Sequence, residues 1–168
     1  MKISTNSIQN GYIQDKYGSK GICREGVPII SFPLSWTDAP QKTESLALVF
    51  QDYDNVPVDG FSWIHWLVAD IPGNIVNLAE NASREDDSLI QGTNTWMTSL
   101  STYHRNEEFT HFYGGPAPGS SPHTYEIRLY ALDCYLNLKK GFYYNELLKK
   151  MNGHVLAEAT IYGRYVSD

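Results

Sequence analysis

Short runs of β-branched and aromatic residues, bounded by turn-forming residues, recur along this chain of 168 residues. Runs of this length and composition are typical of β-strands. The pattern predicts strands at residues 27–32, 45–50, 62–68, 124–132 and 155–166. Because long helical segments do not separate most of these runs, the sequence predicts a mainly β fold, an antiparallel β-sandwich or Greek key, rather than βαβ units.

One segment near the C-terminus has a helical pattern instead. Its apolar residues recur at the i, i+3, i+4 and i+7 positions of one helix face, namely Tyr144, Leu147, Leu148 and Met151. Two lysines follow in the last turn, where they complement the helix dipole, and Gly153 is a stop signal. We therefore expect one or two peripheral helices that pack against the sheets.

The strand predicted at 124–132 alternates, so that Tyr125, Ile127, Leu129 and Ala131 share one face. His123 has the same parity as Tyr125, and Asp52 has the parity of the apolar residues 46, 48 and 50. Polar groups are therefore expected at the ends of inward-facing rows. A pocket at the edge of the core would need this arrangement.

The composition is that of a folded protein, with 42% hydrophobic and 13% aromatic residues, and the length fits a single domain spanning 1–168. Thirteen basic and nineteen acidic side chains give a net charge of −6. This balance argues against nucleic-acid binding and against docking on an anionic membrane, both of which need clustered Lys and Arg. No apolar run approaches the ~20 residues that span a bilayer.

Two cysteines, Cys23 and Cys134, lie far apart in the sequence. A disulfide between them is conceivable, but we interpret them as two free thiols in a reducing compartment. The first residues have no apolar core of the kind found in a secretory signal. The sequence thus predicts a soluble cytoplasmic protein.

The residues with candidate chemistry are an acid, two imidazoles and a phenol near predicted strand ends, beside a Gly-Gly-Pro turn at 114–116. Histidine and tyrosine side chains donate hydrogen bonds, and a glycine-rich turn can offer backbone N–H groups. This inventory suits a small pocket for an anion such as phosphate. Taken one at a time, each residue also has an ordinary structural role, as a buried histidine, a core tyrosine or a turn-forming aspartate.

Several blocks of the sequence together resemble the phosphatidylethanolamine-binding protein family, and in particular its bacterial and archaeal branch, often described as Raf-kinase-inhibitor-like. The blocks lie at residues 33–36, 46–54, 63–68, 114–118, 123–125 and 153–159. The resemblance covers nearly the whole chain. It implies an antiparallel β-sandwich with one or two peripheral helices and a single anion pocket.

Carried over residue by residue, the resemblance assigns ligand binding to Asp52, Asp54, His65, Gly115, Pro116, His123 and Tyr125. Two positions depart from the family pattern. Tyr53 replaces a proline between the two acids, which frees a backbone N–H, and Thr124 replaces an arginine between His123 and Tyr125. Because residue 124 has the opposite parity, the pocket itself is expected to survive while its attraction for anions weakens.

Signatures of common enzymes, such as GxSxG, a P-loop, HExxH and GxGxxG, are missing. Four residues could suggest a metal site, but we interpret them as a solvated loop: His104, Glu107, Glu108 and His111. His154 follows the stop signal of the predicted helix, and we expect it to cap that helix or to pack against neighbouring residues. The sequence therefore predicts no metal and no cofactor.

The function expected from the sequence is binding of a small anion, either phosphate, a phospholipid head group or a carboxylate, with regulation of a kinase or other protein partner. One alternative is an inhibitor of a kinase or peptidase that acts through a surface loop at 96–109. A second is a hydrolase that uses Asp52, His65 and His123 for general acid–base chemistry. A homodimer fits the resemblance, although no residue pattern requires one.

Overall fold

The structure is a computed structural model that describes residues 1–168 apart from 101, 120 and 168. A seven-stranded sheet forms its centre, and every pairing in it is antiparallel except that between β12 and β3. Its strands, in spatial order, are β10 (Ile90–Gln91), β8 (Trp63–Pro72), β7 (Ser45–Asp52), β11 (His123–Leu132), β12 (Val155–Tyr165), β3 (Tyr12–Ile13) and β2 (Ile8–Gln9).

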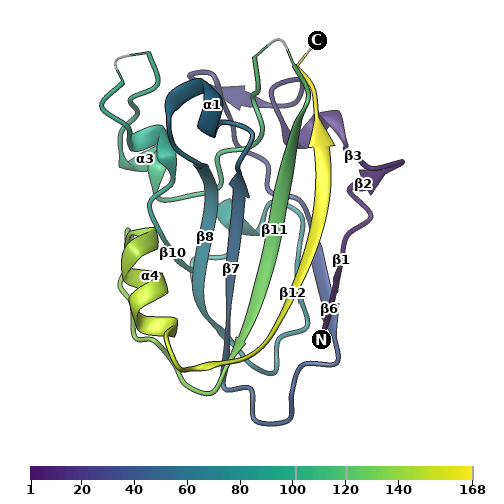
Figure 1. The fold of residues 1–168 in the computed structure, drawn as a ribbon, viewed down its shortest axis with the longest axis vertical. Coiled ribbons are helices and arrows are strands. Elements are labelled where there is room, and N and C mark those ends of the chain that lie inside the picture. The colour runs from purple at the N-terminus through teal and green to yellow at the C-terminus, as the bar shows by residue number, and fades with distance from the viewer. Residues whose placement is uncertain (101, 120, 168) are drawn as a thin grey trace.

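The described residues form two smaller sheets besides the large one. One is three-stranded, with the order β1 (Lys2–Ser4), β6 (Leu34–Thr37) and β9 (Asn77–Leu78), and the other is a ribbon of β4 (Cys23–Arg24) and β5 (Val27–Pro28). The helical elements are α1 (Val56–Asp59), α2 (Ala82–Glu85), α3 (Glu107–Thr110), α4 (Tyr144–Met151) and the 3₁₀ turns Asp15–Tyr17 and Thr95–Met97. Figure 1 shows the four long strands side by side, with α4 near β8 and β10.

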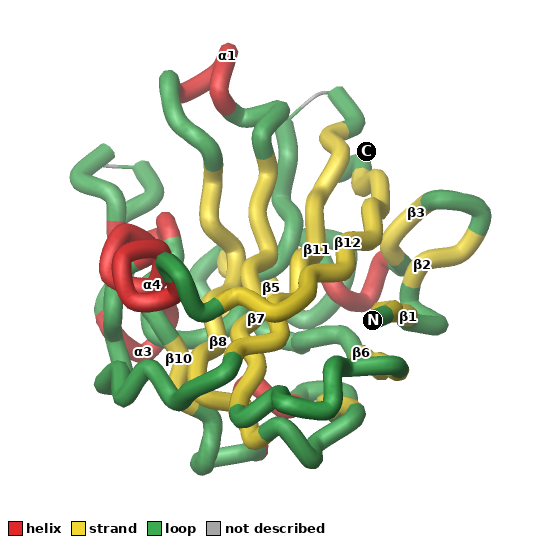
Figure 2. Tube along the Cα trace, turned by 60° about the horizontal axis from the view of Figure 1, so that its bottom comes forward, coloured by secondary structure: helices red, strands yellow, loops and turns green. Residues whose placement is uncertain are grey.

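The central strand β7 is buried on both faces, which explains why its sequence is continuously apolar rather than alternating. Leu46, Leu48 and Phe50 point into the core between the large sheet and the three-stranded sheet. Ala47 and Val49 point the other way, into a second core that α4 covers. The large sheet is thus sandwiched between the small sheet and α4, and Figure 2 gives a second view of these layers.

The strands predicted at 45–50, 62–68, 124–132 and 155–166 are confirmed as β7, β8, β11 and β12, and the predicted helix is α4. The strand predicted at 27–32 is wrong beyond Pro28, where β5 ends. Past that point the Ile29 N–H still donates to the Ile22 carbonyl at 3.1 Å, but the Ser31 carbonyl accepts the N–H of Asn81, the N-cap of α2, at 2.8 Å. Three of the helices are four-residue turns that the sequence pattern did not predict, namely α1, α2 and α3.

Helix α4 also offers a direct test of the packing. Leu147 is 0% exposed in the second core, whereas its neighbour Leu148 is 44% exposed. We expect Leu147→Ala to lower the free energy of unfolding by about 2–5 kcal/mol, because it removes apolar contacts and leaves a cavity. The matched control Leu148→Ala should cost less than about 0.5 kcal/mol. Denaturant unfolding measures both, and equal costs would contradict this placement of α4.

Candidate functional site

A cavity of about 240 Å³ opens where β8 begins, β7 ends and β11 begins. In Figure 1 this is the end of the large sheet near α1. The cavity is lined by side chains from these strands and from three nearby segments, namely Asp52, Asn55, Val58, Asp59, Trp63, His65, Trp96, Tyr103, Ala117, Pro118, Gly119, Ser121, His123 and Tyr125.

Strand register brings the acid, the imidazoles and the phenol together. Tyr125 on β11 pairs with Asp52 on β7, which in turn pairs with Trp63 on β8. His65 follows two residues later on β8, so that it shares the face of Trp63. Parity along β11 predicted that His123 and Tyr125 point inward. Both are buried, whereas Thr124 between them is exposed.

Asp52 holds His123 in a fixed orientation. The His123 Nδ1 lies 2.7 Å from Asp52 Oδ2, and the two side chains are only 9% and 4% exposed. The second carboxylate oxygen, Oδ1, accepts the backbone N–H of Asp54 at 2.8 Å. With Nδ1 donating to Asp52, the other ring nitrogen of His123 is left for a ligand.

His65 is a neutral imidazole that presents an acceptor. Its Nδ1 donates to the Gly114 carbonyl at 2.6 Å, since a carbonyl oxygen can only accept. Burial lowers the pKa of His65, and the nearby Asp52 offsets only part of that effect. Its Nε2 is enclosed and has no partner among the described residues. That atom therefore carries a lone pair that lacks a hydrogen-bond donor.

Tyr125 supplies a donor beside these rings. Burial, reinforced by the negative charge of Asp52, raises the pKa of its phenol, so the hydroxyl keeps its proton. The ring packs edge-on against His65, with centroids 5.2 Å apart. The Tyr125 hydroxyl makes no hydrogen bond with any residue that the structure describes, although the residue lines the cavity.

The Gly-Gly-Pro turn lies behind the cavity rather than on its wall. The Gly114 N–H donates to the His65 carbonyl and the Gly115 N–H to the Pro28 carbonyl, each at 2.9 Å. We expected the backbone amides of this turn to be available for an anion. The amides of Gly114 and Gly115 are instead bonded to carbonyls of the protein. Pro116 does not line the cavity either, and its carbonyl accepts the Ser19 N–H. This part of the cavity wall is formed by residues 117–119.

Asp54, the second acid of the pair, also lies off the cavity wall. Its Oδ2 accepts the backbone N–H of Thr124 at 2.8 Å, and its own N–H donates to Asp52. Asp54 thus ties the end of β7 to the beginning of β11. Asp54 therefore supports the strands that carry the lining residues without lining the cavity itself.

The sequence pattern did not predict an aromatic wall of the cavity. Trp63 packs edge-to-face with Trp96 and with Tyr103, at centroid distances of 5.5 and 5.2 Å. The Nε1 atoms of both tryptophans are buried without a partner among the described residues. Trp63 could have been found, because it has the parity of His65 on one strand. Trp96 and Tyr103 come from an irregular segment with no period to predict them.

The charge of the cavity wall is acidic. Asp52 and Asp59 line it, and no Lys or Arg is among the described lining residues. Positive charge can therefore come only from a protonated imidazole. A ligand that carries its own proton donor suits this wall better than a bare dianion.

The four residues interpreted as a solvated loop do not gather into one cluster. Glu108 pairs with Arg24 at 2.6 Å, whereas His104 lies near the backbone carbonyls of Met97 and Thr98. Cys23 and Cys134 are both free thiols, as expected. Among the described residues, no helix is long and apolar enough to cross a membrane.

Comparison with known proteins identifies the family. The family model described as phosphatidylethanolamine-binding protein matches residues 3–166. The chain belongs to this family. The Bacillus subtilis protein YxkA is 45% identical over 90% of this chain and 92% of its own length, and a UPF0098 protein of Methanothermobacter thermautotrophicus is 39% identical over 98% of both.

Solved structures of the phosphatidylethanolamine-binding protein family share the fold. A putative family homologue from Chlamydia trachomatis, CT736, superimposes with a TM-score of 0.79 at 31% identity, covering 99% of this chain and 97% of its own. Escherichia coli YbcL, described as a new member of the mammalian family, has a TM-score of 0.78 at 24% identity and covers 99% and 98% of the two chains. The predicted family and the predicted β-sandwich are thus confirmed.

The neutral state of His65 predicts a pH dependence of stability. Its pKa is 6.5 when exposed and lower in the folded chain, so below pH 6.5 the unfolded state binds a proton that the folded state does not. The free energy of unfolding that depends on a neutral His65 is fully present above pH 6.5. It is lost as the pH falls toward the pKa of His65 in the folded state. As the pH falls below 6.5, we expect the free energy of unfolding of wild type to decrease by up to about 1.4 kcal/mol per pH unit relative to that of His65→Gln.

Denaturant unfolding between pH 4.5 and 8 would measure this difference. The exposed variant His104→Gln is the matched control, and it should leave the wild-type slope in place. Parallel profiles for wild type and His65→Gln would show that His65 is not held neutral.

Proposed function

We propose that this member of the phosphatidylethanolamine-binding protein family binds a small phosphate-bearing ligand, such as a phosphate monoester or a phospholipid head group, in the cavity at the strand ends. The observation that carries the proposal is the Asp52–His123 pair beside the Tyr125 phenol and the His65 Nε2 acceptor, neither of which has a hydrogen-bond partner in the described part of the chain. Small carboxylates offer fewer acceptor oxygens and should bind more weakly.

The cavity wall offers both hydrogen-bond donors and an acceptor, so it suits a ligand that has acceptor oxygens and also a donor group. Tyr125 donates through its hydroxyl, and His123 donates through Nε2 when the ring is protonated. His65 Nε2 requires a donor, which a protonated phosphate oxygen or an ammonium group supplies. The acidic wall formed by Asp52 and Asp59 also favours an ammonium group over a second negative charge. A phosphate monoanion or phosphoethanolamine fits both requirements.

We propose that the ligand is bound without being converted. A hydrolase would need a nucleophile activated by a nearby base. No Ser, Thr or Cys side chain among the described residues hydrogen-bonds to His65 or His123. The lack of such a nucleophile among the described residues supports binding over catalysis.

We further propose that a protein partner meets the mouth of the cavity. Val58 and Tyr103 line the cavity and are exposed, and the neighbouring residues Met97 and Leu100 are also exposed. Exposed apolar side chains around a polar pocket are typical of interaction surfaces. This partner is expected in the cytoplasm, where thiols stay reduced. Occupancy of the cavity would then change the surface that the partner contacts.

Removing one hydroxyl tests the proposed pocket with little change in shape. Tyr125→Phe should weaken phosphoethanolamine binding roughly ten- to a hundredfold, because a hydrogen bond to a charged group contributes about 1.5–3 kcal/mol. Tyr12→Phe, at an exposed tyrosine away from the cavity, is the matched control and should bind as wild type does. Isothermal titration calorimetry measures all three proteins. Equal affinity in wild type and Tyr125→Phe would overturn the assignment of the pocket.

The choice of anion in the same experiment tests the role of His65. Phosphate carries at least one proton that it can donate at both pH 6 and pH 8, whereas sulfate has the same shape and none. We expect phosphate to bind more tightly than sulfate at both pH values. Equal binding of both anions at both pH values would contradict the acceptor role of His65 Nε2.

A further inference from the structure

Three metal-ligating side chains lie together at the opposite end of β11 from the cavity. Asp133 and Cys134 directly follow β11, and His154 directly precedes β12. Because β11 has ten residues, its two ends are about 30 Å apart. The cluster is therefore separate from the pocket described above.

The backbone holds the cluster in place. Leu132 pairs with Val155 after a register shift, and the Asp133 N–H then donates to the His154 carbonyl at 3.1 Å. Gly153 adopts a positive φ of 83°, which turns the chain from α4 into β12 and brings His154 opposite Asp133. The Ser45 hydroxyl donates to the Cys134 carbonyl at 2.6 Å. Each ligand thus extends from an anchored main chain.

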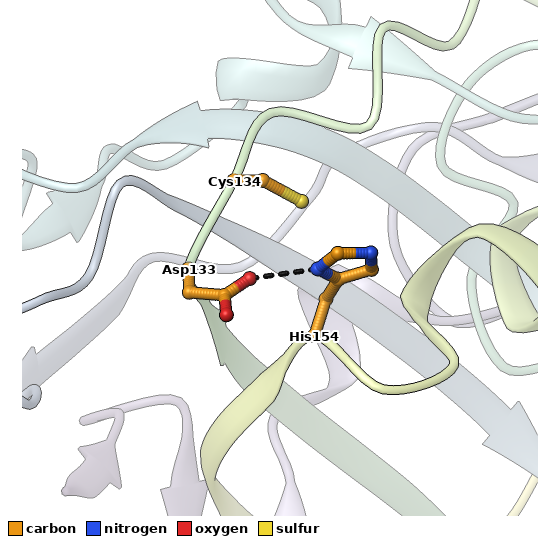
Figure 3. Close-up of side chains that lie close together, drawn as sticks. All are labelled: Asp133, Cys134 and His154. Carbon is orange, nitrogen blue, oxygen red and sulfur yellow. Dashed lines mark hydrogen bonds and ion pairs between the residues drawn. The ribbon is translucent and has the colours of Figure 1, made fainter.

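Figure 3 shows the three side chains close together, with Asp133 and His154 facing each other and the Cys134 thiol beside them. The carboxylate oxygen, imidazole nitrogen and thiol sulfur lie within 4.8 Å of one another, and Asp133 Oδ1 is 2.8 Å from His154 Nδ1. In a tetrahedral zinc site with bonds of 2.0–2.3 Å, neighbouring ligand atoms are about 3.3–3.7 Å apart. Small rotations of these side chains reach that spacing, because Asp133 and His154 are 43% and 47% exposed.

We propose that Asp133, Cys134 and His154 bind Zn²⁺ or a divalent metal ion of similar softness. Sulfur, nitrogen and oxygen are the ligand atoms that zinc takes in proteins, and three protein ligands leave a fourth position for water or another group. The ion would replace the hydrogen bond between Asp133 and His154. It would also displace the thiol proton, so that the carboxylate and the thiolate balance its two positive charges.

The surrounding charges favour a cation. Asp133 and Asp70 bring negative charge to the Cys134 thiol, and Lys150 brings the opposing positive charge. The same acidic surroundings attract a divalent ion. Asp70 itself is occupied, since its carboxylate accepts the backbone N–H groups of Leu136 and Leu138.

A Cys–His–Asp nucleophile is the other interpretation of these three residue types. A reactive cysteine needs a base within hydrogen-bond reach of its thiol, whereas His154 Nδ1 bonds to Asp133 and no hydrogen bond joins His154 to the Cys134 thiol among the described residues. The metal interpretation rests on the mutual spacing of the three ligand atoms. It differs from the sequence-based expectation, in which His154 only caps or packs and no metal is bound.

Cobalt is a suitable probe, because a Co²⁺–thiolate bond has a charge-transfer absorption that aqueous Co²⁺ lacks. The untagged, reduced full chain would be titrated with Co²⁺ and then with Zn²⁺. We expect saturation at one ion per chain with the thiolate band, and loss of the band as Zn²⁺ displaces Co²⁺. Cys134→Ser should abolish the band, while Cys23→Ser, at the other free thiol, should keep it.

The remaining ligands are tested by affinity. His154→Gln and Asp133→Asn should each weaken Zn²⁺ binding at least roughly tenfold, since even an outer-shell partner is worth about ten- to a hundredfold. Thermal unfolding in a chelator checks that each variant folds as wild type does. Absence of the band in wild type, its persistence in Cys134→Ser, or its loss in Cys23→Ser would each overturn the proposal. A failure of phosphate binding would not, because the two sites share no residue.

Discussion

The hydrogen bond between Asp52 and His123 is the interaction on which the candidate site depends. A carboxylate that is 4% exposed has lost most of its water and needs hydrogen-bond donors in return. It receives them from His123 Nδ1 and from the backbone N–H of Asp54. Both donors are in reach only because β7 and β11 pair in a register that places Tyr125 opposite Asp52. The site is thus a consequence of how the two central strands are aligned.

This constraint also sets the chemistry of the cavity. Asp52 orients His123, burial keeps His65 neutral, and the negative charge of Asp52 helps to keep the Tyr125 hydroxyl protonated. A single buried acid therefore influences all three groups that can contact a ligand. The wall that results offers both donors and acceptors but little positive charge. For that reason we favour a ligand that carries a proton or an ammonium group beside its phosphate.

The sequence predicted the positions of side chains that follow from the alternation of a strand. It did not predict positions that depend on backbone contacts between residues remote in sequence. Alternation along β11 was sufficient to place His123 and Tyr125 on the buried face. It could not reveal that the Gly114 and Gly115 amides are used by carbonyls of residues 65 and 28, which are remote in sequence. The tryptophan and tyrosine contributed by the segment 96–103 follow no period. The approach of His154 to Asp133 likewise depends on the turn at Gly153 and on pairing between two strands.

Histidine ring NMR during a titration with phosphoethanolamine tests the central claim most directly, because it reports on each imidazole separately. The account predicts that free His65 shows the neutral form protonated at Nδ1 at pH 7. It also predicts that the ring signals of His65 and His123 shift on addition of ligand, while those of His104, His111 and His154 do not. A charged His65 in the free protein, or shifts confined to the other three histidines, would contradict the account.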